Sequence, residues 1–319
     1  MFVVVAALVW WFAHQDGRFF IAGMAAPASE LLGPLLPAAS AGLVAALVFS
    51  VVDAGAGAWA AGVAVVMFLA LPGFLPLHRH SLSGPPLEAG VMLTLAVMLY
   101  APRFSVAYGT LAAITAVFVS PAGAGLPLAA IAWAVMTRRA GGSRAWRRIL
   151  LSLSPLLLAI LLGRWFGNAW NGQLVVGWRG HLDDGLRAAG TIIGDQLAPT
   201  LTNPALRWFA IADLTLVLVA ITVVAWRRVR RLQAFDAISA RFHPALAVTA
   251  AGLALGLALR WLLVPQSPPL DLDAVFPLVV LALVASVGSV GMLWRQWPRW
   301  GKLICGLVLL GWLQAAMRA

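Results

Sequence analysis

Charge and cysteine are both scarce in this chain. Only 10% of its 319 residues are charged, 11 of them acidic, and it has a single cysteine. Soluble domains are about a quarter charged, so this composition excludes an ordinary soluble domain. One cysteine, Cys305, excludes an internal disulfide; it lies in an apolar run, where we expect it only to pack.

The sequence also lacks the common catalytic and metal-binding motifs. It has no Walker loop, no dinucleotide-binding fingerprint, no G-x-S-x-G elbow, no His-x3-His pair and no cysteine pair. His78 and His80 are two residues apart, so they do not share a helix face. No metal site is predicted, and the need for a divalent ion stays open. The SVGSVG stretch, 286–291, is interpreted as small residues that let helices pack closely.

Apolar runs fill most of the chain, which is 62% hydrophobic with a mean hydropathy of +0.93. Runs of about 17–25 residues can each cross a ~30 Å hydrocarbon core as a helix. We therefore expect an all-α, polytopic integral membrane bundle of about 11 transmembrane helices, forming one domain over 1–319. The predicted spans are 1–13, 36–53, 56–76, 86–101, 105–120, 121–137, 149–166, 205–226, 244–264, 275–294 and 303–317.

The formal net charge of +11 comes mostly from arginines beside the apolar runs. This is the pattern of the positive-inside rule and indicates no nucleic-acid partner. An even number of predicted spans separates each pair of basic connections, so one topology makes all of them cytoplasmic. It gives a multi-pass protein of the inner or plasma membrane with a cytoplasmic N-terminus. The basic connections are 138–148, 227–243 and 295–302, and the predicted outer loops include 14–35, 77–87 and 167–204.

Most acidic residues fall on the predicted outer side, which is where we expect any chemistry. Asp16 follows the first span in HQDGRFF, with Arg18 beside it. A positioned carboxylate can take a proton from an attacking hydroxyl. A solvated aspartate that ends a helix fits the same place, and position alone favours that second interpretation.

A second polar stretch, LPLHRHSLSGPPLEAG, contains His78, Arg79, His80 and Glu88. Arginine at a membrane boundary can hold a lipid-linked phosphate through bidentate hydrogen bonds. An ionisable residue inside a span is costly unless it is paired or functional. Arg79 reaching to headgroups and Glu88 stabilised by a helix dipole explain the same residues equally well.

The third polar stretch, WNGQLVVGWRGHLDD, lies in the longest predicted outer loop and contains Arg179, His181, Asp183 and Asp184. Its tryptophans can stack on sugars but fit the aromatic belt of a membrane interface at least as well. The aspartate pair suits the first turn of a helix. Arg179 and His181 are the better candidates for ligand binding.

The order of these features resembles the GT-C superfamily of membrane glycosyltransferases, which use polyprenyl-phosphate sugars on the outer face of the membrane. The likeness covers residues 1–205, with 206–319 supplying further C-terminal transmembrane helices. The stretches that carry it are HQDGRFF followed by IAGMAAPASELLGPLL, then HRHSLSGPPLEAGVMLTLAVMLY, then AYGTLAAITAVFVSPAGAGLPLAAIAWAVMTRRAGG, and finally AWRRILLSLSPLLLAILLGRWFGNAWN.

The resemblance implies that Asp16 is the general base and that Arg79, His78, His80 and Arg179 bind the donor phosphate. It implies a polyprenyl-phosphate sugar as donor substrate. The implied partners are membrane lipids and an acceptor, which is a glycan, a lipid or a protein. Partner subunits of a membrane complex are also implied. The residues with an implied supporting role are Arg18, Glu88, His181, Asp183 and Asp184.

Two other functions fit the sequence. A non-catalytic GT-C-like subunit or scaffold of a larger complex would explain why the first outer loop has Asp16 alone where the family often has paired acidic residues. A transporter would be expected to show two similar halves or helices broken near the membrane midplane. The sequence shows neither of these clearly.

Overall fold

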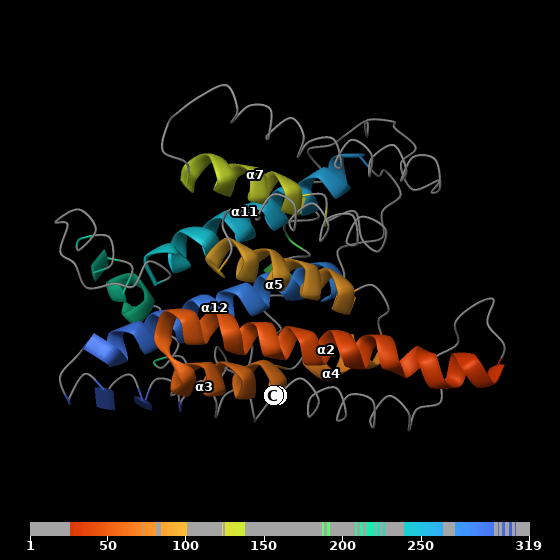
Figure 1. Ribbon diagram of the computed structural model, residues 1–319, viewed down its shortest axis with the longest axis horizontal. Coiled ribbons are helices and arrows are strands. Elements are labelled where there is room, and N and C mark those ends of the chain that lie inside the picture. The colour runs from red at the N-terminus through yellow and green to blue at the C-terminus, as the bar shows by residue number, and fades with distance from the viewer. Residues whose placement is uncertain are drawn as a thin grey trace. The chain divides into compact units, whose positions relative to one another are not determined.

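The structure, a computed structural model, is all-helical over the residues that it describes. It contains α2 (Ala26–Ala56), α3 (Ala58–Leu69), α4 (Phe74–His80), α5 (Gly84–Tyr100), α7 (Gly125–Thr137), α11 (Ser239–Leu263) and α12 (Leu272–Gln296) (Figure 1). The all-α prediction is confirmed for this part of the chain. The described residues are 26–71, 73–80, 84–100, 123, 125–137, 239–263 and 272–296, with isolated positions within 187–226 and 299–310.

Three of the described helices are long and apolar enough to cross a membrane, as a multi-pass membrane protein requires. The segments are Ala38–Ala56 in α2, Ala240–Ala258 in α11 and Ala274–Arg295 in α12, and they fall on three predicted spans. The full set of about 11 spans is not shown. The predicted spans 1–13, 105–120 and 149–166 lie outside the described residues, and 205–226 and 303–317 are described only at isolated positions.

Helix α2 joins the last part of the predicted outer loop 14–35 to the next predicted span. Helix α2 begins at Ala26 and continues without a break to Ala56, so the last part of that predicted loop is helical. A proline in the interior of a helix usually breaks or kinks it, and α2 contains Pro34 and Pro37. In a membrane helix, however, neighbouring groups and local adjustments satisfy the backbone atoms that a proline frees.

The predicted span 56–76 is wrong as a single helix. Helix α3 ends at Leu69 and α4 begins at Phe74. The sequence between them contains Leu-Pro-Gly at 71–73, and a proline disfavours helical backbone in the residue before it. The apolar run is continuous across this point, which is why hydropathy alone did not reveal the break.

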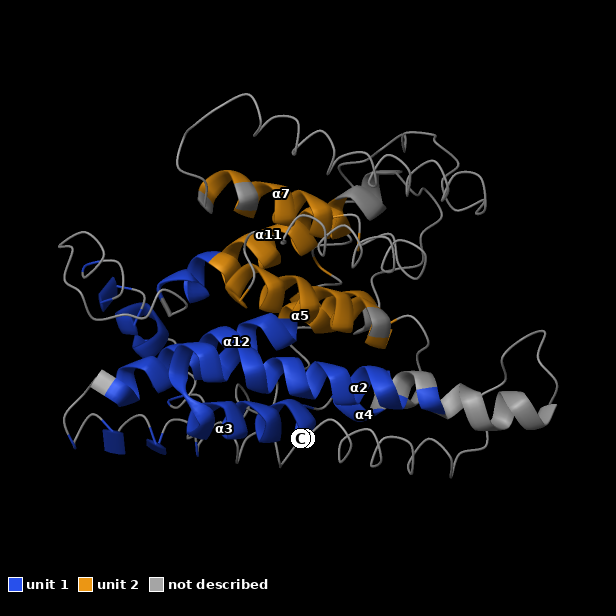
Figure 2. Cartoon of the chain, viewed as in Figure 1, with its two compact units in different colours: residues 1–80, 193–244, 279–319 blue, residues 81–192, 245–278 orange. Residues whose placement is uncertain are grey.

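The chain forms two compact units, each assembled from segments that are distant in the sequence. The first contains residues 1–80, 193–244 and 279–319, and the second contains 81–192 and 245–278 (Figure 2). Helices α2, α3 and α4 belong to the first unit, and α5 and α7 belong to the second. Helices α11 and α12 contribute residues to both.

In the first unit, α2 and α3 form a hairpin around one residue. Gly57 separates the two helices and has φ +99°, a conformation that glycine adopts without steric cost. Its N–H donates to the Asp53 carbonyl at 3.0 Å, and its carbonyl accepts from the Ala61 N–H at 3.0 Å. The turn therefore satisfies backbone groups at both helix ends, and α3 folds back along α2 (Figure 1).

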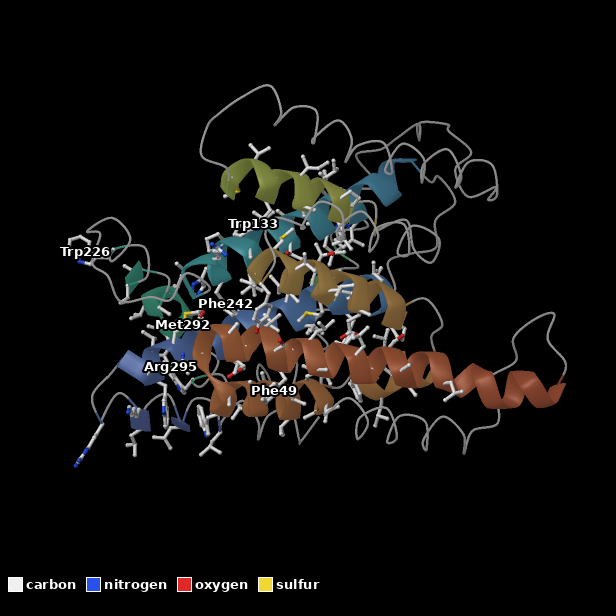
Figure 3. The ribbon with its side chains drawn as sticks, viewed as in Figure 1. Phe49, Trp133, Trp226, Phe242, Met292 and Arg295 are labelled. Carbon is white, nitrogen blue, oxygen red and sulfur yellow. The ribbon has the colours of Figure 1, made fainter. Side chains whose placement is uncertain are left out.

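Small residues on α12 allow close packing in the same unit. A Cβ on Gly291 would lie 2.5 Å from Ala56 Cβ and 2.7 Å from Ala60 Cβ. A Cβ on Gly288 would overlap the ring of Phe242, which Figure 3 labels on α11. The interpretation of SVGSVG as a helix-packing stretch is confirmed.

Small residues also allow close packing in the second unit, where α7 meets α11. A Cβ on Gly252 would lie 2.8 Å from the Gly125 carbonyl oxygen and would overlap Ala129. Gly125 and Ala129 are four residues apart on α7, as are Gly252 and Gly256 on α11. Such small-xxx-small pairs let membrane helices approach at backbone distance.

Gly288→Ala tests the packing on Phe242. The added methyl has no room, so we expect it to destabilise the protein by about 1–3 kcal/mol and to lower the melting temperature in detergent. Gly62→Ala is the matched control because a Cβ at Gly62 meets nothing within 4 Å. Replacing a helical glycine there should be neutral or slightly stabilising. Equal melting temperatures for the two variants would contradict the packing described.

Candidate functional site

The structure describes the side chains of two of the predicted site residues, His78 and Glu88. Arg79 and His80 are the last residues of α4, and their side chains lie outside the described part. The other predicted site residues lie outside the described residues altogether: Asp16, Arg18, Arg179, His181, Asp183 and Asp184. Their predicted roles stay predictions.

His78 is fully buried on α4. Phe74, Leu77 and His78 have the i, i+3, i+4 spacing of one helix face, and all three are buried. The imidazole lies against Phe74, with ring centroids 4.5 Å apart, and edge-on to Phe68 at 6.2 Å. The histidine is therefore held within the apolar packing of the first unit.

Its hydrogen bond fixes which ring nitrogen carries the proton. Nδ1 lies 2.9 Å from the carbonyl oxygen of Phe74, one turn earlier on α4. A carbonyl oxygen only accepts, so Nδ1 is the protonated nitrogen and donates. In the neutral ring, Nε2 is then an acceptor or base, and it can donate to an anion only as part of an imidazolium.

Glu88 is also fully buried, on α5 in the second unit. Helix α5 begins at Gly84 and has no acidic residue in its first turn, whereas the helix dipole acts mainly within that turn. The dipole explanation for Glu88 is therefore not supported. Its neighbours Leu87 and Met92 are buried and apolar. Ionisable groups within membrane helices are paired or functional, so Glu88 stays a functional candidate.

His78 belongs to the first unit and Glu88 to the second. Their convergence on one catalytic centre with Asp16 and Arg79 stays a prediction. Within the described residues, no group of three or more His, Cys, Asp or Glu could hold a metal ion.

Sequence reasoning missed one polar pair, which joins α11 to α12 in the first unit. His243 Nε2 lies 2.9 Å from Ser289 Oγ, and the Ser289 hydroxyl donates to the Ala285 carbonyl at 2.6 Å. Because that hydroxyl proton is already used, Ser289 accepts and His243 Nε2 donates. His243 Nδ1 is then the unprotonated nitrogen of the neutral ring; it is buried and has no hydrogen-bond partner in the described structure.

Two weak indications of this pair are present in the sequence. His243 ends the basic connection 227–243, which was interpreted only as evidence of topology. Ser289 lies within SVGSVG, which was interpreted only as packing. The two residues are 46 positions apart, and neither has a neighbour in sequence that points to the other.

Comparisons with protein-family models, curated proteins and solved structures give no match to this chain. The likeness to GT-C enzymes thus depends on the order and predicted topology of its sequence features.

His78→Ala and His78→Phe separate packing from hydrogen bonding. The alanine variant leaves a cavity beside Phe68 and Phe74, and we expect a loss of about 2–4 kcal/mol. The phenylalanine variant fills the space and loses the bond to the Phe74 carbonyl, about 1 kcal/mol. Thermal unfolding in detergent measures both, with the exposed Leu75→Ala as control. Equal losses in both His78 variants would show that the ring is not packed as described.

Proposed function

We propose that this chain is a membrane glycosyltransferase of the GT-C kind, which transfers a sugar from a polyprenyl-phosphate donor to an acceptor on the outer face. The observation that carries the proposal is the complete burial of His78 and Glu88 in apolar helices. Ionisable groups at such positions are expensive and are kept mainly where a function needs them. The GT-C-like order of the polar stretches indicates which function that is.

In this reaction, an acceptor hydroxyl oxygen attacks the anomeric carbon of the donor sugar. Asp16 takes the hydroxyl proton as the new glycosidic bond forms. The bond between the anomeric carbon and the phosphate oxygen breaks, and polyprenyl phosphate leaves with the electron pair. A cation near that oxygen stabilises the developing negative charge.

Arg79 is the first choice for this cation, because a guanidinium is always charged and binds phosphate through two hydrogen bonds. His78 is less suited. Its Nδ1–H donates to the Phe74 carbonyl. We therefore assign His78 the role of positioning α4. His80 and Arg179 stay proposed phosphate ligands, and Glu88 stays a proposed supporting residue.

A second candidate is a transporter, and the division between α3 and α4 favours it. Helix α3 has 12 residues and is therefore about 18 Å long, too short to cross a ~30 Å hydrocarbon core. Discontinuous helices of this kind form substrate sites in many transporters. A non-catalytic subunit has no such observation in its favour.

Asp16→Asn tests the enzyme proposal directly. The purified protein is placed in vesicles with a panel of polyprenyl-phosphate hexoses and cell-envelope acceptors, and released polyprenyl phosphate is measured by mass spectrometry. Loss of the base should reduce release by about 10²–10⁴-fold. Arg79→Gln should also reduce it. Arg187→Gln, at an exposed position, is the charge-matched control and should keep full activity.

Two results would count against the proposal. Full turnover by Asp16→Asn would remove the proposed base. Uptake of an intact substrate into sealed vesicles, with no release of polyprenyl phosphate by the unmodified protein, would favour the transporter.

A further inference from the structure

We propose that one end of the first unit binds the headgroup of an anionic phospholipid. The site, called here the headgroup site, consists of the turn at Gly57, the stacked Trp59 and Trp294, and the cations that end and follow α12. These cations are Arg295, Arg299 and Lys302. The inference is independent of the proposed transferase activity, since it concerns the end that the charge pattern places on the cytoplasmic side.

Arg295 is an exposed cation whose guanidinium lies on the backbone of the α2–α3 turn. A Cβ on Gly57 would lie 2.6 Å from its Nη2 and 3.0 Å from its Cζ. The absence of a side chain at Gly57 therefore makes room for the guanidinium. Arg295 is in the last turn of α12, and Gly57 directly follows the end of α2. Both C-terminal helix ends carry partial negative charge, which holds the cation there.

Within the part of the chain that the structure describes, Arg295 forms no ion pair with a carboxylate. Arg299 and Lys302 follow α12 closely and are exposed. Asp53, near the end of α2, is the one acidic residue that the structure describes at this end. Positive charge therefore prevails, and an anion is the complementary ligand.

Two indoles lie beside this charge. Trp59, in the first turn of α3, stacks on Trp294 with ring centroids 4.6 Å apart and planes at 20°. Trp59 is 49% exposed, although burial is the more favourable state for so large an apolar ring in water. Indoles favour the headgroup level of a bilayer, where the ring meets acyl chains and the N–H meets water.

The combination of cations and indoles favours a lipid over a soluble anion. A soluble phosphate would need only the cations, whereas a phospholipid also covers the exposed face of Trp59. The cytoplasmic leaflet holds anionic lipids, and each nearby Lys or Arg strengthens their binding by about fivefold. The cations of the headgroup site thus match the phosphate of an anionic phospholipid, and the exposed face of Trp59 matches the adjoining apolar chain.

Lipid titration of the purified full-length protein in a non-ionic detergent tests the proposal. Bound lipid is counted by native mass spectrometry, and the melting temperature is measured in parallel. Phosphatidylglycerol, phosphatidylcholine with the same acyl chains, and inorganic phosphate alone are the three probes. We expect phosphatidylglycerol to bind more tightly than phosphatidylcholine and to raise the melting temperature more.

Arg295→Gln should weaken phosphatidylglycerol binding by about fivefold and leave phosphatidylcholine binding unchanged. Arg187→Gln, which removes an exposed charge from the second unit, should change neither. The double variant Arg299→Gln/Lys302→Gln provides the same test through side chains that are exposed, should Arg295→Gln fail to fold.

Three results would overturn the proposal: equal binding of the two lipids by the unmodified protein, unchanged preference for phosphatidylglycerol in all the site variants, or stabilisation by inorganic phosphate alone that matches the lipid effect.

Discussion

Close approach of helix backbones at glycine is the contact on which both described units depend. In lipid, apolar side chains gain little by leaving the solvent, so helices associate through van der Waals packing and short contacts between small residues. Gly291 provides such a contact on α12, and Gly125 and Gly252 provide them between α7 and α11, whereas Gly288 makes room for the ring of Phe242. A larger side chain at any of these positions would separate the helices.

The glycine contacts also decide which helix ends meet. In the first unit, a Cβ on Gly55 would lie 2.8 Å from Met292 Cε and 2.9 Å from the Phe242 ring. The end of α2, the start of α11 and the end of α12 therefore lie together, and Figure 3 labels Phe242, Met292 and Arg295 in this region. The charge pattern placed the same three ends on one side of the membrane, so packing and charge agree.

The two ends of the first unit consequently differ in character. One carries Arg295 and the stacked tryptophans. Helix α3 runs away from it, and α4, which holds His78, lies farther along α2 (Figure 1). The buried histidine is thus on the part of the unit that leads toward the predicted outer face, as chemistry at that face requires.

The sequence was informative where apolar length alone decides the structure. The spans predicted at 36–53, 244–264 and 275–294 each overlap a long described helix, because such runs have few alternatives in lipid. Prediction from the sequence failed where tertiary context decides whether a helix continues or ends. The prolines of α2 lie within a continuous helix, whereas the break before α4 lies inside a continuous apolar run.

The candidate site was predictable in residue type but not in arrangement. The cost of an ionisable group in a span singled out Glu88, yet only the observed start of α5 shows that it lies beyond the first turn. The pairing of His243 with Ser289 needs two helices in register. The SVGSVG stretch predicts close packing on α12, but it does not indicate which helix packs there.

The topology is the central claim, and cysteine accessibility tests it most directly. In a Cys305→Ser background, single cysteines are placed by Asp53→Cys at the end of α2 and by Arg187→Cys in the predicted outer loop 167–204; both positions are exposed. A membrane-impermeant maleimide added to intact cells should label the Arg187→Cys protein at once and the Asp53→Cys protein only after permeabilisation. Labelling of both from the same side, or in the reverse order, would contradict the account.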